Sequence, residues 1–216
     1  MPSSNSETIP IVIGLARLLA PTRVLDVGAG FGKYGVLFRE YLELLFAQET
    51  SDWTKDDAQR RRKVRIDAVE GFRAYIGPLH EWVYDEIFVQ EVQDFLKGDW
   101  EYDVIFMGDV LEHFEKRFAL EELLPRLVSR SRMGVLIVTP LKCDDQGVVF
   151  GNRLEIHRSL WRPKDFHRIA RFVYVGRRNS NLIVFLTEHK ECYRLARGNP
   201  IRRKLRLFKR ALLDSW

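Results

Sequence analysis

The feature that most restricts the fold of this chain is a short apolar run followed by a glycine turn and a helical pattern. Residues 23–27 read RVLDV, which is typical of a buried strand, and Gly28, Gly30 and Gly32 follow directly. From Tyr34 onward, apolar residues recur at spacings of three and four, the period of an amphipathic helix. A strand, a tight turn and a helix in this order predict the first unit of an α/β sheet.

The same alternation continues through most of the chain. Further strands are predicted at 64–69, 86–90, 102–107 and 133–138, and helices at 9–20, 72–82 and 116–131. The strand runs are almost continuously apolar, which favours a parallel sheet covered by helices on both faces. Two last strands, at 171–176 and 181–187, flank the turn residues Asn179 and Ser180 and are expected to pair as a hairpin.

The composition indicates a globular domain with a sizeable core. Of the 216 residues, 46% are apolar and 30% are charged, which excludes a disordered chain and a collagen. No run of about 18 apolar residues predicts a membrane span, and residues 1–7 lack the basic-then-apolar pattern of a signal peptide. Cys143 and Cys192 form neither a disulfide framework nor a metal-ligand spacing, so we expect a cytoplasmic protein.

The basic charge of the chain is concentrated at one end. The net charge is +5, but residues 194–216 carry eight basic residues and one acidic residue, +7, which leaves −2 for residues 1–193. We therefore expect one domain at 1–193, with a polar insertion at 48–63 and a lid loop at 141–162, followed by a basic helix at 194–216. A nucleic-acid partner is disfavoured because the domain itself has no basic excess.

The basic segment has an amphipathic pattern. In 201–216, apolar residues recur at helical spacing between arginines and lysines. Such a helix could pack on the domain, bind RNA, or lie on an anionic membrane surface, which would make the cytoplasmic protein a peripheral membrane protein. The pattern leaves these alternatives open. The apolar positions are Ile201, Leu205, Phe208, Leu212 and Trp216.

The glycine turn and the residue that ends the second strand are candidate ligand contacts. Glycine lets the backbone approach a ligand closely, and the N-terminus of the following helix favours a carboxylate or phosphate. Glu70, directly after the strand at 64–69, could accept both hydroxyls of a ribose. Dinucleotide enzymes carry the pattern G-x-G-x-x-G. Here the glycines read G-x-G-x-G, and position 33, where the third glycine of that pattern would stand, is Lys. A turn without a ligand, an exposed Glu70 and a nicotinamide-dependent oxidoreductase remain alternatives at this stage.

Four segments, taken in order, resemble the motifs of class I S-adenosylmethionine (SAM)-dependent methyltransferases. The first is 24–32, VLDVGAGFG, which is similar to motif I of that family. The others are 68–70 (AVE), 90–95 (QEVQDF) and 102–113 (YDVIFMGDVLEH), the last with the D-V-L-E-H run of the small-molecule branch. The resemblance implies a Rossmann-like three-layer sandwich, with a seven-stranded, mostly parallel sheet and an antiparallel C-terminal hairpin strand.

The resemblance also implies roles in binding SAM as the cofactor. Asp26 and the glycine backbone would hold the methionine part, and Glu70 would hold the ribose. Glu91 would lie beside the adenine, and Asp109 would lie at the mouth of the site. The cofactor-binding set implied in this way is Asp26, Gly28, Ala29, Gly30, Gly32, Glu70, Gly71, Glu91, Val92, Met107, Gly108 and Asp109.

Two histidines are candidate catalytic residues. The methyl group of SAM is already activated, so the protein mainly aligns the acceptor, and an acceptor hydroxyl also benefits from a general base, most often His. His113 follows the fourth strand, and His157 lies in 151–163 (GNRLEIHRSLWRP), which resembles a loop of methyltransferases near sugar-modifying systems. Trp161 would there form a wall of the acceptor site. Packing roles for both histidines are the alternative, and Glu112 is expected to be exposed. No cluster of His, Cys and carboxylate residues has the sequence spacing of a metal site, so we predict that no metal is bound.

The acceptor is constrained mainly by what is missing after the fourth strand. DNA amino-methylating enzymes of this fold carry Asn/Asp-Pro-Pro-aromatic there, whereas residues 107–110 read MGDV, which disfavours base methylation. We therefore predict methyl transfer to an oxygen of a small molecule such as a sugar, a glycolipid or another metabolite. A non-catalytic protein of the same fold and an RNA methyltransferase that uses 201–216 are the alternatives, and the sequence leaves the oligomeric state open.

Co-sedimentation with liposomes tests the membrane alternative for residues 201–216. If this segment lies on anionic lipid, the full chain should sediment with anionic liposomes at low salt and detach at high salt, because salt screens the attraction. A chain that lacks 201–216 should stay in the supernatant. If the full chain also stays in the supernatant at low salt, the segment does not bind membranes.

Overall fold

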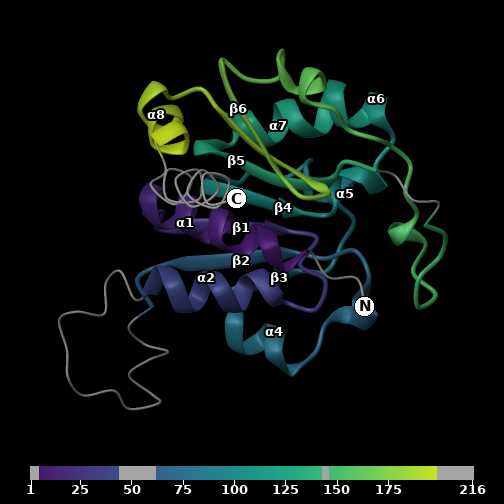
Figure 1. Ribbon diagram of the computed structural model, residues 1–216. Helices are drawn as coiled ribbons and strands as arrows, with labels where there is room; N and C mark the ends of the chain where they lie inside the picture. The colour runs from purple at the N-terminus through teal and green to yellow at the C-terminus, as the bar shows by residue number, and fades with distance from the viewer. Residues whose placement is uncertain (1–4, 44–61, 143–145, 199–216) are drawn as a thin grey trace, which may run out of the picture.

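Seven strands form one sheet in the computed structural model, which describes residues 5–43, 62–142 and 146–198 (Figure 1). They are β1 (Arg23–Val27), β2 (Arg65–Val69), β3 (Glu86–Phe88), β4 (Tyr102–Gly108), β5 (Ser131–Pro140), β6 (Phe172–Arg178) and β7 (Asn181–Thr187). The strand order is β3-β2-β1-β4-β5-β7-β6. Strands β1 to β5 pair in parallel, and β7 is antiparallel to both β5 and β6. The predicted mostly parallel, Rossmann-like sheet with an antiparallel hairpin is therefore confirmed.

Helices cover both faces of this sheet. The α-helices are α1 (Ile9–Leu19), α2 (Lys33–Glu43), α4 (Pro78–Val83), α5 (Val92–Phe95), α6 (Lys116–Phe118), α7 (Leu124–Ser129) and α8 (Lys190–Gly198). Shorter 3-10 or π segments are η1 (Ser6–Thr8), η3 (Arg73–Tyr75), η4 (Leu111–His113), η5 (Ala119–Leu123), η6 (Arg153–Glu155) and η7 (Pro163–Phe166). In Figure 1, α2 and α4 lie below the sheet and α6 and α7 lie above it.

Each face of the sheet has its own apolar core. On one face, α1, α2 and α8 pack on strand side chains such as Val24. On the other face, α5, α7 and η7 pack on strand side chains such as Leu25. Successive strand residues point to opposite faces, so neighbouring Val24 and Leu25 belong to different cores. This double burial explains why the strands read as continuous apolar runs.

The predicted helix at 72–82 is two shorter helices, η3 and α4. Gly77 has an extended backbone, with φ of −141°, and Pro78 begins α4. Proline lacks an N–H and disfavours helical geometry in the residue before it, so it interrupts the first helix and starts the second. The predicted helix at 116–131 ends at Ser129, and its middle turn, η5, is a π-helix.

The carboxyl ends of β1, β2 and β4 lie level with one another. Val27, the last residue of β1, pairs with Val69 of β2 and with Met107 of β4. The strands β2 and β4 flank β1 on opposite sides, and open α/β sheets bind ligands at such a point of reversal. The register therefore brings the segments that start at Gly28 and Glu70 next to the end of β4.

Two predicted segments fall largely or wholly outside the described residues. They are the polar insertion at 48–63, of which only 62 and 63 are described, and the amphipathic segment at 201–216. Helix α8 continues through the expected domain boundary at 194. No helix among the described residues is long and apolar enough to cross a membrane.

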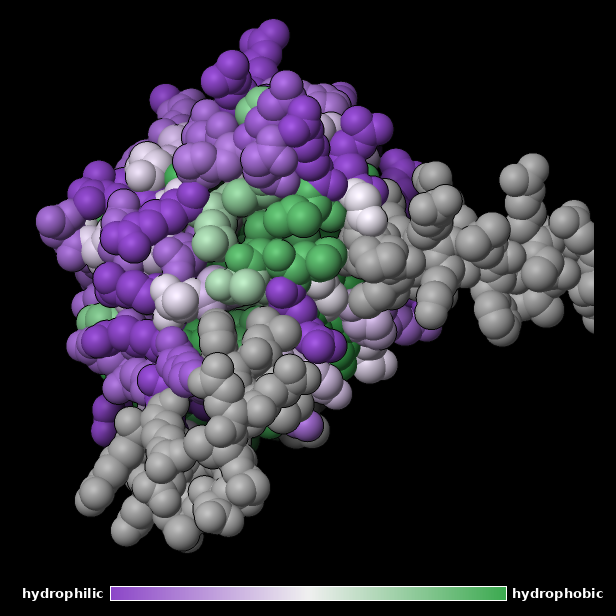
Figure 2. Space-filling model, turned by 90° about the vertical axis from the view of Figure 1, so that its left-hand side faces the viewer, coloured by the Kyte–Doolittle hydropathy of each residue, from purple (hydrophilic) through white to green (hydrophobic). Residues whose placement is uncertain are grey.

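Apolar side chains gather on the face shown in Figure 2, on the side of α1 and α8. Leu18 of α1 and Leu195 of α8 are 37% and 40% exposed.

Replacing Gly134 with alanine should destabilise the fold. Gly134 in β5 has φ of +153°, and an added Cβ would lie 2.5 Å from the Leu186 carbonyl oxygen and 2.7 Å from the Phe185 ring. Because one of these neighbours is backbone, we expect Gly134→Ala to lower the free energy of unfolding by about 1–3 kcal/mol. Gly147→Ala is the control, since its Cβ would meet nothing within 4 Å. Equal denaturation midpoints for the two variants would contradict the packing described for β5 and β7.

Candidate active site

A cavity of about 880 Å³ opens at the carboxyl ends of β1, β2 and β4. It is lined by the glycine turn, the start of the segment after β2, the end of β4 and part of the loop at 146–158. Its volume suits a nucleoside-sized ligand together with a small second molecule. Of the residues predicted from the sequence, it brings together Asp26, Gly28, Ala29, Gly30, Glu70, Gly71, Glu91, Val92, Gly108, Asp109, His113 and His157.

Gly32 and Met107 are the predicted residues that do not line this cavity. The Met107 side chain is fully buried in the apolar core that contains α7, and its backbone pairs with β1 and β5. Gly32 lies behind the turn, where an added Cβ would come within 3.5 Å of the His80 ring. Neither residue is part of the cavity lining.

The glycine turn has a backbone that larger residues would disturb. Gly28 has φ of +72°, and an added Cβ would lie 2.4 Å from a methyl group of Val110. The buried His80 accepts a hydrogen bond at Nδ1 from the Gly77 N–H, and its Nε2 then donates to the Gly30 carbonyl, 2.9 Å away. His80 therefore has a structural role, because it holds the turn in place.

Glu70 lies directly beside the glycine turn and is buried, which excludes the exposed alternative. It is 6% exposed, and its carboxylate accepts from the Gly30 N–H at 2.9 Å and the Phe72 N–H at 2.8 Å. Burial raises the pKa of Glu70, while these two bonds act in the opposite direction. An ionised carboxylate has about four acceptor positions, so Glu70 keeps the capacity to accept from two hydroxyls of a ligand.

Asp26 is a buried acid held by a tyrosine that sequence analysis missed. The Tyr84 hydroxyl donates to Oδ2 of Asp26 at 2.6 Å, across 58 positions of sequence. Burial raises the pKa of Asp26 to about 7, against the lowering effect of the Tyr84 bond, and the charge of Glu70 adds to the rise. A cation placed beside Asp26 would favour the ionised form.

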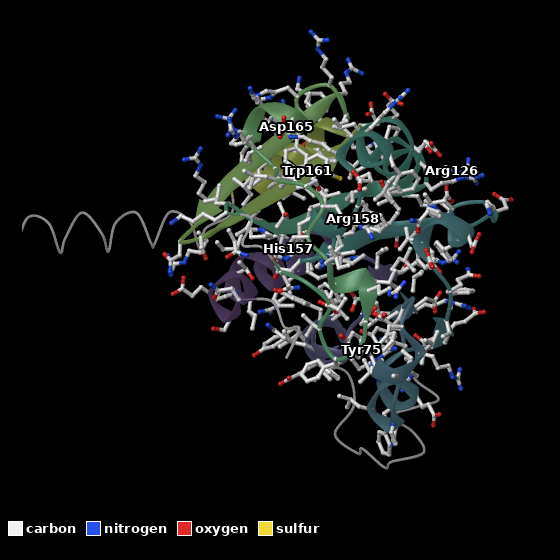
Figure 3. All side chains as sticks on the ribbon, turned by 90° about the vertical axis from the view of Figure 1, so that its right-hand side faces the viewer. Tyr75, Arg126, His157, Arg158, Trp161 and Asp165 are labelled. Atoms are coloured by element: carbon white, nitrogen blue, oxygen red, sulfur yellow. The ribbon has the colours of Figure 1, made fainter. Side chains whose placement is uncertain are left out.

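The loop at 146–158 closes one side of the cavity through contacts with the segment after β2. The Tyr75 hydroxyl donates to Oε1 of the largely buried Glu155 at 3.0 Å, and Leu154 packs against Gly71. Figure 3 shows Tyr75 below the segment of this loop that carries His157 and Arg158. Neither Tyr75 nor Glu155 was predicted as a site residue. The loop pattern around His157 was the available signal for Glu155, and nothing marked Tyr75.

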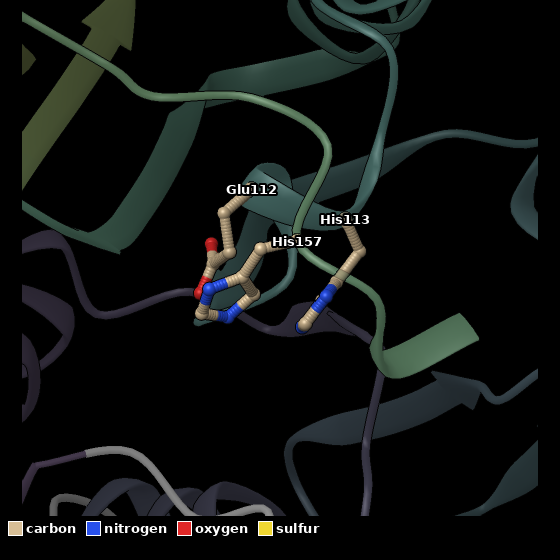
Figure 4. A group of neighbouring side chains, drawn as sticks. All are labelled: Glu112, His113 and His157. Atoms are coloured by element: carbon tan, nitrogen blue, oxygen red, sulfur yellow. The ribbon is translucent and has the colours of Figure 1, made fainter. Parts of the chain in front are cut away.

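Glu112, His113 and His157 form a cluster in the wall of the cavity (Figure 4). Each offers a ligand atom, and these atoms lie within 4.8 Å of one another. The rings of His113 and His157 are 5.1 Å apart, and the Thr139 hydroxyl donates to Oε2 of Glu112 at 3.1 Å. Glu112 is only 2% exposed, so the expectation of an exposed Glu112 was wrong: it follows β4 on η4 and points inward.

Burial shifts the two titratable groups on η4 in opposite directions. It raises the pKa of Glu112, and the charge of Asp109 adds to the rise. It lowers the pKa of His113 to about 4, and the neighbouring His157 contributes to this lowering. At neutral pH His113 is therefore an uncharged imidazole. A base with so low a pKa accepts protons poorly, but it can accept a hydrogen bond or bind a cation.

Trp161 does not form a wall of the acceptor site, contrary to the prediction. Its side chain is fully buried beside Phe166 in the core that contains α7, and its Nε1–H donates to the Ser159 hydroxyl at 2.9 Å. Figure 3 places it above His157, on the side of Asp165. A large apolar ring in a loop can serve a core as readily as a site, and the loop here turns inward after Ser159.

Comparisons with known proteins point to one fold. No family model and no curated protein matches the sequence. Among solved structures, human methyltransferase-like protein 13 in complex with SAH is 18% identical, with a TM-score of 0.55 over 90% of this chain and 92% of that one. A SAM-dependent methyltransferase from Archaeoglobus fulgidus is 13% identical, with a TM-score of 0.53 over 82% of this chain and 93% of that one.

A third structure shares the fold over part of a longer chain. An O-methyltransferase family protein from Burkholderia thailandensis is 13% identical, with a TM-score of 0.55 over 84% of this chain and 57% of that one. The strand order and the position of the cavity agree with these similarities. The chain therefore has the Rossmann-like fold of class I SAM-dependent methyltransferases.

Proposed function

We propose that this chain is a SAM-dependent methyltransferase that methylates an oxygen atom of a small molecule. The observation that carries the proposal is the meeting of the glycine turn, Asp26 and Glu70 at one cavity. These residues fit SAM: Glu70 can accept from the ribose hydroxyls, and an ionised Asp26 complements the ammonium and sulfonium charges. The turn at Gly28 leaves open the space that a Cβ would occupy.

The contribution of the chain is to bind and align both molecules. When SAM is bound, an acceptor oxygen can bond to its methyl carbon while the carbon–sulfur bond breaks, its electron pair returns to sulfur and the hydroxyl proton passes to water. Alignment of this kind can supply about 7–11 kcal/mol of a barrier. We assign the contact with the acceptor to His113 and His157, which line the same cavity.

The lining around these histidines supports a small acceptor with polar and apolar parts. Phe114 and Phe118 contribute aromatic surface, and Arg158 and Glu115 contribute charge. The likeness to an O-methyltransferase family protein supports an oxygen as the methylated atom. A sugar or glycolipid presents hydroxyls together with an apolar ring face or chain, and we propose this class of acceptor.

Calorimetric titration tests the cofactor proposal. The full chain should bind SAM and S-adenosylhomocysteine but not NAD, and Glu70→Ala should weaken both affinities at least tenfold, because hydrogen bonds to a charged group contribute about 1.5–3 kcal/mol each. The matched control is Glu122→Ala, which removes an exposed carboxylate on η5. Binding of NAD alone would indicate an oxidoreductase, and no binding of any of the three would indicate a scaffold protein.

The affinity for SAM should depend on pH through Asp26. Its pKa of about 7 in the free protein means that the carboxyl is mostly protonated below neutral pH, whereas the cationic ligand prefers the ionised form. We expect the dissociation constant to rise by up to about tenfold per pH unit from 7 down to 5.5, and to level off near pH 8. Asp26→Asn should bind more weakly with a flat profile. The same slope in both proteins would exclude Asp26 as the titrating group.

A further inference from the structure

We propose that Glu112, His113 and His157 bind one divalent first-row transition-metal cation beside the acceptor position of the cavity. Two imidazole nitrogens and one carboxylate are a ligand set that suits zinc, cobalt, manganese or iron and leaves coordination positions open. Magnesium and calcium prefer oxygen ligands alone and fit this set poorly. The metal site itself is independent of the proposed methyl transfer, and only its chemical role depends on it.

The three ligand atoms are already close to a coordinating arrangement. They lie within 4.8 Å of one another, whereas ligands about 2.1 Å from a tetrahedral cation are about 3.4 Å apart. Side-chain rotations that move the ligand atoms by about 1 Å would shorten these distances to the tetrahedral value. Figure 4 shows Glu112 and His113 extending from η4 and His157 entering from the separate loop, with all three side chains on the same side of the ribbon.

Backbone hydrogen bonds fix the two segments that carry these ligands. The N–H groups of Arg158 and Ser159 both donate to the Glu112 carbonyl, at 2.8 and 3.0 Å. The Ser159 hydroxyl is also 3.4 Å from the same carbonyl. The residue after His157 is thus tied directly to Glu112. A site preorganised in this way loses little conformational entropy when it binds a cation.

Hydrogen bonds orient two of the three proposed ligands, His113 and Glu112. The Ile156 carbonyl can only accept, so Nδ1 of His113 donates to it across 3.3 Å, and a cation would bind through Nε2. A metal-binding histidine typically donates its second nitrogen to a carbonyl or carboxylate in this manner. Glu112 is likewise oriented by the Thr139 hydroxyl, which occupies one of its oxygens at 3.1 Å.

The burial of Glu112 and its lack of an ion pair among the described residues also favour a bound cation. Its carboxyl group is 2% exposed, and no lysine or arginine among the described residues forms an ion pair with it. Two basic side chains of the adjoining segments pair with other acids: Lys116 with Asp165, and Arg158 with Glu115. Ionising a buried carboxyl group without a cationic partner is costly, and a bound divalent cation would favour the ionised form.

Such a cation would assist the proposed methyl transfer. Coordination of an acceptor hydroxyl lowers its pKa, so the proton leaves to water more readily and the oxygen attacks the methyl carbon more easily. The carbon–sulfur bond then breaks with its electron pair remaining on sulfur. In this role the two histidines would serve methylation of a hydroxyl as ligands of the cation.

Cobalt titration of the chelator-treated full chain tests the proposal. Co²⁺ should bind with a stoichiometry of one, seen by calorimetry and by the visible absorption bands of nitrogen-coordinated cobalt, and Mg²⁺ should not compete at equal concentration. His157→Ala and Glu112→Gln should each weaken Co²⁺ binding more than tenfold and change the visible bands. His167→Ala, which removes an exposed histidine on the surface, is the matched control and should leave both readouts unchanged.

Two further measurements separate this proposal from the others. Thermal melting and SAM titration of His157→Ala show whether that variant is folded, since the proposed SAM contacts are the glycine turn, Asp26 and Glu70. Cobalt binding with no SAM binding would retain the metal site and overturn the proposed function, whereas SAM binding with no cobalt binding would overturn the metal site alone. Cobalt binding that His157→Ala and Glu112→Gln leave unchanged would also overturn it, because the cation would then bind elsewhere.

Discussion

Three parallel strands that end at the same level determine where every part of the site lies. Val27, Val69 and Met107 occupy one row across β1, β2 and β4. The chain leaves β1 and β2 at this row and β4 one residue later, so residues far apart in sequence meet without any long-range recognition by their own side chains. The Gly30 N–H can then donate to Glu70 across 40 positions of sequence. A shift of one residue in either pairing would turn these side chains to the wrong face.

Buried acids are the common electrostatic feature of the cavity. Asp26, Glu70 and Glu112 are each nearly inaccessible to water, and burial raises the pKa of all three. Within the described part of the chain they are held by neutral donors: a tyrosine hydroxyl, backbone N–H groups and a threonine hydroxyl. A cavity built in this way favours positively charged occupants. Both proposed occupants, a sulfonium cofactor and a divalent cation, meet that condition.

Prediction from the sequence succeeded where a signal was local. The run 23–27 and the three glycines after it gave the first strand, the turn and the following helix, because apolar period and glycine content act within a few residues. Prediction failed for Trp161, which packs in the core, and for Glu112, which is buried. An aromatic residue in a loop, or an acid after a strand, has no local property that fixes the direction of its side chain.

The sequence by itself determined the alternation of strands and helices, the hairpin at the end of the sheet and the identity of the glycine turn. Each of these depends on periodicity and turn chemistry between near neighbours. Only the tertiary structure decided that Tyr84 holds Asp26, that Tyr75 holds Glu155 and that His113 and His157 lie together. Those contacts join helices and loops whose relative positions are set by packing on the two faces of the sheet, and packing depends on the whole chain at once.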